Sequence, residues 1–238
     1  MSLHRAFRFL RLPQALFFLV GFSSLAQPHF DTLIRVADSY PVEFYQKKTG
    51  VNTKFINGKE YKAYRATRDE TPYLFLDWSE ADLEYDGQQY KRVPIMVDLS
   101  TGAVVVSYMN GYLQLVKEKL SHFVIKGRTF VFLRPAGLSA DFYELLYKGK
   151  VEVYSHRQRK AQERIDGMNI FREFEEHVQY YVMVKNDLHA IKNKNDFLEL
   201  FPKQIPQLKA HITKEKLRFK KNFEKDLIVL SEFGDRLE

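Results

Sequence analysis

Residues 83–108 read LEYDGQQYKRVPIMVDLSTGAVVVSY, and this stretch decides the fold of the chain. The pair Asp86-Gly87 predicts a type I′ hairpin turn, because both central residues of that turn need positive φ angles. The tripeptide Ser-Thr-Gly at 100–102 predicts a second turn, with glycine at the position that must be left-handed. The stretch therefore predicts three consecutive antiparallel strands.

The middle strand of this stretch alternates in polarity. One face would carry Val93, Ile95, Val97 and Leu99, and the other would carry Tyr90, Arg92, Met96 and Asp98. A period of two is typical of a strand with one face in a core. Proline cannot donate a ladder hydrogen bond, so Pro94 predicts either an edge strand or a β-bulge at that point.

The same rhythm of short apolar segments and glycine-containing turns continues along most of the chain. Further strands are expected at residues 122–125, 128–133, 141–147, 150–156, 178–184 and 188–191. The charged residues between 156 and 178 predict a strand end, a linker and a solvated helix end. Because no helix long enough for a parallel crossover separates the strands, we expect an antiparallel meander that forms a sandwich or a partly closed barrel.

The spacing of the apolar residues changes after Ile191. Residues 196–201 predict a short helix that Pro202 ends, and later apolar residues recur at intervals of three and four. These residues are Ile205, Leu208, Ile212, Phe223, Leu227, Leu230 and Leu237. The chain is therefore expected to be α+β and mainly β, with C-terminal amphipathic helices packed on the sheet. A helix that docks a partner or lies on a membrane surface is the alternative.

The first 26 residues have the features of a secretory signal peptide. Arg5, Arg8 and Arg11 precede the apolar run ALFFLVGF at 15–22, and Ser24 and Ala26 are small residues at the positions that signal peptidase reads. The run is shorter than the roughly 20 residues of a membrane span. We expect cleavage after Ala26, and no later stretch is apolar enough for a transmembrane span.

Composition limits the classes of function. The formal net charge is +7, and three of the arginines belong to the expected signal peptide, so the remaining excess is too small to predict a nucleic-acid partner. The chain has no cysteine, which excludes disulfides and thiol chemistry. We expect an antiparallel β domain at 27–192 and a helical segment at 193–238.

Six short segments of the chain are similar to those of a known group of proteins. They are INGKEY at 56–61, YDG at 85–87 with VP at 93–94 and VDL at 97–99, FYELLYKG at 142–149, and KLRF at 216–219. In order and spacing they resemble a widespread, functionally uncharacterised family of small exported proteins of Bacteroidota. The resemblance covers most of the chain after residue 26. It implies export and a β-then-α layout, and it implies no catalytic residue.

Two clusters of charged residues are candidate sites. The acidic cluster consists of Asp77, Glu80, Asp82 and Glu84, of which the last three would share one face of a strand and could offer oxygen ligands to Ca²⁺. An acidic, solvent-facing strand is the simpler interpretation. The basic cluster consists of His156, Arg157, Arg159, Lys160 and Arg164. It could bind a polyanion such as a lipopolysaccharide headgroup, or it could be a solvated strand end.

The chain contains no recognisable motif for catalysis or cofactor binding. It has no HExxH, no GxSxG and no glycine-rich phosphate loop. We therefore predict no catalytic, cofactor-binding or metal residue. The sequence favours an exported, non-enzymatic binding or accessory protein that works in the periplasm, with the outer membrane or outside the cell, in a periplasmic or outer-membrane protein complex. The alternative is a hydrolase whose carboxylates, drawn from Asp77, Asp82, Asp98 and Glu144, meet only in the fold.

Overall fold

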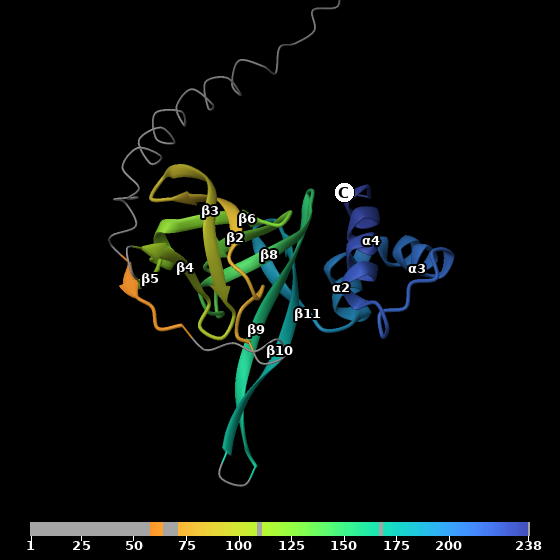
Figure 1. The fold of residues 1–238 in the computed structure, drawn as a ribbon. Coiled ribbons are helices and arrows are strands. Elements are labelled where there is room, and N and C mark those ends of the chain that lie inside the picture. Colours follow the sequence, from red (N-terminus) through yellow and green to blue (C-terminus); the bar gives the residue numbers. More distant parts are fainter. Residues whose placement is uncertain (1–57, 64–70, 109–110, 167–168, 238) are drawn as a thin grey trace, which may run out of the picture. The chain divides into compact units, whose positions relative to one another are not determined.

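The computed structural model describes residues 58–63, 71–108, 111–166 and 169–237, and of residues 163–166 and 169–172 it describes only the backbone. All of these belong to one compact unit, Ser39–Glu238. The α+β, mainly β class is confirmed, because an antiparallel sheet of eleven described strands is followed by C-terminal helices (Figure 1). The expected signal peptide lies outside the described residues.

The strands follow one another in the sheet almost in chain order, as expected of a meander. Their order is β1-β5-β4-β3-β2-β6-β7-β8-β9-β10-β11. Their bounds are β1 Lys59–Glu60, β2 Ser79–Tyr85, β3 Gln88–Asp98, β4 Ala103–Tyr108, β5 Gly111–Gln114, β6 Leu120–Ile125, β7 Arg128–Leu133, β8 Asp141–Lys148, β9 Val151–Asp166, β10 Asn169–Val184 and β11 Asp187–Ile191. A short 3₁₀ turn, η2 (Lys117–Lys119), precedes β6.

The turns predicted around β3 are confirmed. Asp86 and Gly87, between β2 and β3, have φ angles of 53° and 73°, as a type I′ turn requires. Gly102, between β3 and β4, has a φ of 66°. These two turns therefore fix the register of β2, β3 and β4.

A β-bulge next to Pro94 changes which side chains of β3 face the core. Ala81 pairs with Val93 and Leu83 pairs with Tyr90, so one residue of β2 lies opposite two of β3. Arg92 has a φ of 51° there, and its amide donates to Asp82 Oδ1 at 2.9 Å. The extra residue reverses the alternation, so Tyr90 is buried with the aliphatic face and not on the opposite face as expected.

The sheet curls around its main apolar cluster but stays open. Leu83, Ile95, Phe123 and Phe130 come from four different strands and belong to this cluster, which is buried on one face of the sheet. Through this curl the Arg159 amide of β9 reaches the Leu99 carbonyl just after β3, at 3.1 Å. The two strands are not neighbours in the pairing order, so the barrel is not closed.

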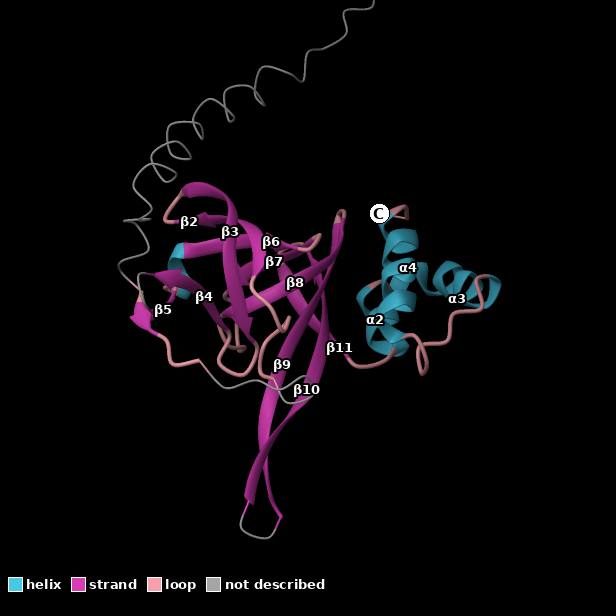
Figure 2. Ribbon diagram, viewed as in Figure 1, coloured by secondary structure: helices cyan, strands magenta, loops and turns pink. Residues whose placement is uncertain are grey.

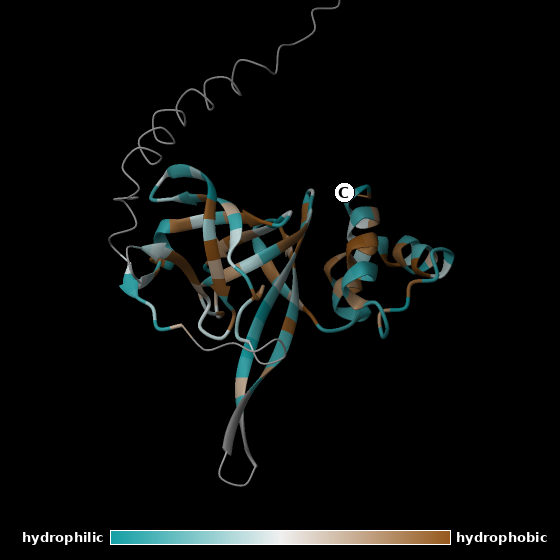
Figure 3. Cartoon of the chain, viewed as in Figure 1, coloured by the Kyte–Doolittle hydropathy of each residue, from teal (hydrophilic) through white to brown (hydrophobic). Residues whose placement is uncertain are grey.

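The β9–β10 hairpin continues beyond the rest of the sheet. Its pairing runs from Val184 opposite Val151 to Asn169 opposite Asp166, whereas β8 pairs with β9 only as far as Ser155. The remainder is a two-stranded ribbon, whose described part is mostly hydrophilic (Figures 2 and 3). The linker and helix end predicted at 157–177 are therefore wrong, because both segments are β-strand.

Helices follow the sheet, at α2 (Lys194–Leu200), α3 (Ile205–Lys214) and α4 (Phe223–Asp235), with a 3₁₀ turn, η3 (Pro202–Gln204), between the first two. Asn193 begins α2 with a capping box, in which its side chain and that of Asp196 each accept from the other's backbone amide. In the described residues no helix combines the length and hydropathy that a membrane crossing needs.

The helices bury their apolar faces against the last strands of the sheet. Phe197, Leu208, Leu227 and Leu230 are fully buried in a second apolar cluster, together with Val153 of β9. The other members from the sheet are Val151, Val182 and Ile191. Short helices are marginal in water, so this burial accounts for most of their stability.

Candidate functional site

Arg157 of β9 is the centre of a network of charged side chains. Its Nε donates to Glu144 of β8 at 2.8 Å, and Nη1 lies 3.4 Å from Glu176 of β10. Nη2 bonds Glu224, in the first turn of α4. Arg128 also binds Glu144 with two hydrogen bonds, of 2.5 and 2.7 Å. This Arg157 network therefore joins four strands, β7 to β10, to helix α4.

The network keeps Glu144 ionised. Burial alone would raise the pKa of this carboxyl group, but hydrogen bonds and charge from Arg128 and Arg157 outweigh burial, so the pKa is lowered. Ser155 adds a hydrogen bond of 3.1 Å. A general acid needs a raised pKa, so Glu144 has the wrong electrostatics for that role.

A hollow of about 500 Å³ opens onto this network, but its charges cancel. Its lining is Leu74, Arg128, Glu144, Arg157, Arg159, Glu176 and Glu224. Three arginines face three glutamates, and the same ion pairs would have to break before an anion could bind. We therefore interpret the hollow as the surface of a structural ion-pair network.

The basic cluster predicted at 156–164 is divided between the two faces of β9. His156 is buried on the opposite face from Arg157, where its Nε2 lies 3.1 Å from Asp141 Oδ2 and its ring stacks on Tyr143. Arg159 donates to the carbonyls of Thr71 and Tyr73, at 2.6 and 3.0 Å. Lys160 is exposed, and the side chain of Arg164 is outside the description. The polyanion site stays a prediction, in which three of the five residues already have partners in the fold.

Asp141 is a second buried carboxylate that stays ionised. Burial would raise its pKa, but hydrogen bonds from His156 and Lys117 outweigh burial and lower it. Lys117 Nζ lies 2.9 Å from Asp141 Oδ1. The backbone at Gly102 approaches the same pair so closely that a Cβ there would lie 2.4 Å from Lys117 Nζ. This group therefore ties the β3–β4 turn to the start of β8.

The predicted acidic cluster lies at the surface. Glu80, Asp82 and Glu84 alternate along the outer face of β2, as expected, while Asp77 is exposed before that strand. Glu84 accepts from Gln89 at 2.6 Å. Nowhere in the described ranges do three His, Asp or Glu side chains come together in a group that could hold a metal ion. The arrangement matches the simpler interpretation of a solvated acidic face.

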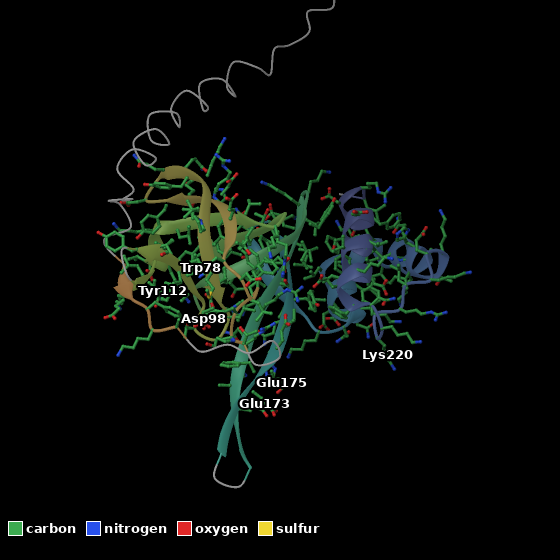
Figure 4. The ribbon with its side chains drawn as sticks, in the orientation of Figure 1. Trp78, Asp98, Tyr112, Glu173, Glu175 and Lys220 are labelled. Carbon is green, nitrogen blue, oxygen red and sulfur yellow. The ribbon has the colours of Figure 1, made fainter. Side chains whose placement is uncertain are left out.

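The four carboxylates of the predicted hydrolase alternative have separate surroundings. Asp77 and Asp82 are exposed, whereas Asp98 is fully buried and accepts from Tyr61 at 2.7 Å and from Ser100 (Figure 4). Glu144 belongs to the Arg157 network. Asp82, Asp98 and Glu144 each have different partners, and none of these contacts joins two carboxylates into a pair of the kind that glycoside hydrolysis uses.

A mostly apolar hollow lies among the helices, and we call it the C-terminal groove. Its volume is about 630 Å³. Its lining is Lys192, Asn193, Lys194, Asn195, Ile212, Leu217, Arg218, Phe219, Lys220, Lys221 and Phe223. Ile212, Leu217, Phe219 and Phe223 are half-buried and form an apolar floor. Exposure alternates along the segment between α3 and α4. Leu217 and Phe219 are half-buried and belong to the floor, whereas Arg218 and Lys220 are exposed.

The rim of the C-terminal groove is strongly basic. Its five cations are Lys192, Lys194, Arg218, Lys220 and Lys221, all exposed, and its lining holds no aspartate or glutamate. Among the residues that the structure describes, none of the five forms an ion pair, in contrast to Arg157. Figure 4 shows Lys220 extending outward from the helices. The groove thus combines apolar contact area with five cations whose side chains form no ion pair in the described part of the chain.

The C-terminal groove was not among the sites predicted from the sequence. The signal that could have found it is the alternation Lys216-Leu217-Arg218-Phe219-Lys220, in which every second residue is basic. Lys192 and Lys194 are distant from this segment in the sequence, and only the folded chain brings them to the same groove.

Comparison of the chain with models of protein families, with curated proteins and with solved structures finds no match in any of the three.

Proposed function

We propose that this chain is an exported, non-enzymatic binding or accessory protein of the cell envelope, and that the C-terminal groove is its binding site. The observation that carries the proposal is the apolar floor bordered by five exposed cations without acidic partners. A concave, mostly apolar site with a few polar groups at its edge is the usual form of a ligand site. The charge of the rim selects an anionic partner.

The electrostatics of the buried carboxylates support binding over hydrolysis. The pKa values of both Asp141 and Glu144 are lowered, each by cationic or hydrogen-bonding neighbours that outweigh burial. Hydrolases that work with two carboxylates need one of them to stay protonated near neutral pH, which requires a raised pKa. Both side chains instead act as internal anions that hold strands together.

The sequence features of the first 26 residues support export. Outside the cytoplasm, anionic headgroups at the outer membrane and acidic surfaces of neighbouring proteins are the partners that such a groove would meet. A periplasmic or outer-membrane assembly is therefore the proposed setting.

A capture experiment with matched charge variants tests the proposal. The chain from residue 27 onward is immobilised and exposed to detergent-solubilised envelope, and both retained proteins and retained lipids are identified by mass spectrometry. The double variant Lys220→Glu/Lys221→Glu reverses part of the rim. Lys225→Glu is the control, because Lys225 is exposed on α4 and does not line the groove.

We expect an anionic component that the wild type and the Lys225→Glu control retain and that the double variant loses. Identical retained sets for all three proteins would overturn the assignment of the groove. Thermal melts of all three show whether the charge reversals leave the fold intact, and exposed substitutions are expected to change stability by less than about 0.5 kcal/mol.

A further inference from the structure

We infer that the ligand of the C-terminal groove is a single-chain amphiphile with an anionic headgroup, such as a fatty acid or an alkyl phosphate. The inference rests on the proposed function and narrows its ligand to one chemical class. It combines the shape of the groove, the state of its polar groups and the arrangement of its cations.

The apolar surface has the form of a track that can take one chain. The groove of about 630 Å³ lies within the roughly 300–1,000 Å³ of small-molecule sites. A second hollow, of about 330 Å³, adjoins it along β10 and β11 and shares Lys192 and Phe223 with it. Tyr180 and Ile191 contribute to that second lining, so the apolar surface continues past Phe223.

The floor is recessed and not raised, which favours a chain that enters the protein over a membrane surface that the protein lies on. Leu217 and Phe219 are half-buried, while the cations beside them are exposed. A helix or loop that inserts into a bilayer presents its large apolar residues outward. Here those residues lie beneath the charged rim.

The polar groups at one end of the groove are already used within the fold. The Asn193 side chain accepts from the Asn195 amide at 2.8 Å and donates to Asp196 at 2.7 Å. Asp196 Oδ2 in turn accepts the Lys192 amide at 2.7 Å. A bound peptide would need hydrogen bonds for its own backbone. An alkyl chain needs only apolar contact. Because the side chains of Asn193 and Asp196 are already hydrogen-bonded within the α2 capping box, the groove favours the amphiphile over an acidic peptide.

The cations come from two segments that are separate in the sequence. Lys192 and Lys194 belong to the start of α2, and Arg218, Lys220 and Lys221 belong to the loop before α4. Four of the five are lysines, which act as mobile point charges and do not impose the planar geometry of an arginine fork. Such a rim suits a carboxylate or a phosphate headgroup equally.

Calorimetric titration of the chain from residue 27 onward separates these ligand classes. The probes are dodecanoate and dodecyl phosphate below their critical micelle concentrations, with dodecanol as the neutral match and acetate as the headgroup alone. A glutamate-rich peptide and phosphatidylglycerol vesicles represent the two competing partners. The proteins are the wild type, Lys220→Gln/Lys221→Gln and the control Lys225→Gln.

We expect saturable binding of dodecanoate or dodecyl phosphate, one molecule per chain, with neither dodecanol nor acetate binding comparably. The double variant should raise the dissociation constant about tenfold, because two rim charges are removed, and the control should leave it unchanged. The ratio of the two affinities shows whether the headgroup is a carboxylate or a phosphate.

The inference is overturned if neither amphiphile binds, if dodecanol binds equally well, or if only the peptide or the vesicles bind. If the titration overturns the inference but the capture experiment still retains a partner that depends on Lys220 and Lys221, the proposed function is still supported. If capture and titration are both insensitive to these lysines, the groove is not a binding site and both proposals fail.

Discussion

The carboxylate of Asp235, in the last turn of α4, accepts the backbone amide of Val151 at 2.8 Å, at the start of β9. The same carboxylate accepts from the Tyr147 hydroxyl at 3.2 Å. Between these two partners the chain turns at Gly149, where a Cβ would lie 2.5 Å from Asp235 Oδ2. The C-terminal end of the last helix is therefore fixed to the β8–β9 turn by hydrogen bonds as well as by apolar packing.

Replacement of Asp235 by alanine is expected to destabilise the protein by roughly 1–3 kcal/mol, because it leaves the Val151 amide and the Tyr147 hydroxyl without an acceptor. Urea denaturation measures the loss. Glu232→Ala is the control, because Glu232 is exposed on the same helix and should change the free energy of unfolding by less than about 0.5 kcal/mol. Equal effects of the two substitutions would contradict the assigned role of Asp235.

Leu227→Ala tests whether the helices are held by the sheet. Leu227 is fully buried in the second apolar cluster, so the substitution should cost about 2–5 kcal/mol in the isolated protein. Phe223 is half-buried at the groove, and Phe223→Ala should cost less. Thermal melts without any partner measure both. A melt of Leu227→Ala that matches that of the wild type would show that the apolar face of α4 is not buried.

A matched pair of glycine substitutions tests the β2–β3 turn. A Cβ at Gly87 or at Gly111 would meet no atom within 4 Å, so neither substitution causes a clash. Gly87 has a φ of 73°, whereas Gly111 is not among the glycines with positive φ. Gly87→Ala should therefore cost about 1–2 kcal/mol from backbone strain alone, and Gly111→Ala should cost much less. Equal unfolding free energies for the two variants would refute the strain argument.

The sequence predicted those parts of the fold that are encoded locally. Turn residues such as Asp86 and Gly87 carry their own φ preference, and the helical spacing of Leu227 and Leu230 marks a buried face without reference to the sheet. These signals were sufficient for the antiparallel meander, for its turns around β3 and for the helices after it.

Features that depend on distant residues were not predictable in the same way. Pro94 predicted a β-bulge as one of two alternatives, but the burial of Tyr90 was not predicted. That burial depends on the register of β3 against β2, which alternation along one strand does not reveal. The outer part of β9–β10 carries charges on both faces, so it lacks the apolar alternation that marks a strand. Each of its strands forms by pairing with the other. The C-terminal groove needs Lys192 and Lys220 from different segments, so only the fold brings its rim together.

Export is tested by the N-terminus of the mature protein. The small residues Ser24 and Ala26 predict cleavage after Ala26, so N-terminal sequencing of protein from the native envelope should begin at Gln27. Ala26→Phe places a large side chain at the cleavage position and should cause a longer precursor to accumulate. A folded envelope protein that retains Met1 would contradict the prediction.

The ionised state of Glu144 predicts a particular dependence of stability on pH. The pKa of Glu144 is lowered because Arg128 and Arg157 outweigh the effect of burial. A carboxyl group whose folded pKa is lowered contributes stability above its unfolded pKa, near 4.3, and loses that contribution as the pH falls through the folded pKa.

Glu144→Gln removes the contribution and should cost about 2 kcal/mol at neutral pH. In urea denaturation, the difference from the wild type should be largest at neutral pH and should shrink below roughly pH 4. The control Glu80→Gln, on the exposed face of β2, should follow the wild-type curve. A Glu144→Gln difference that stays constant down to acidic pH would mean that shape and not charge holds β8 to β9 at this point.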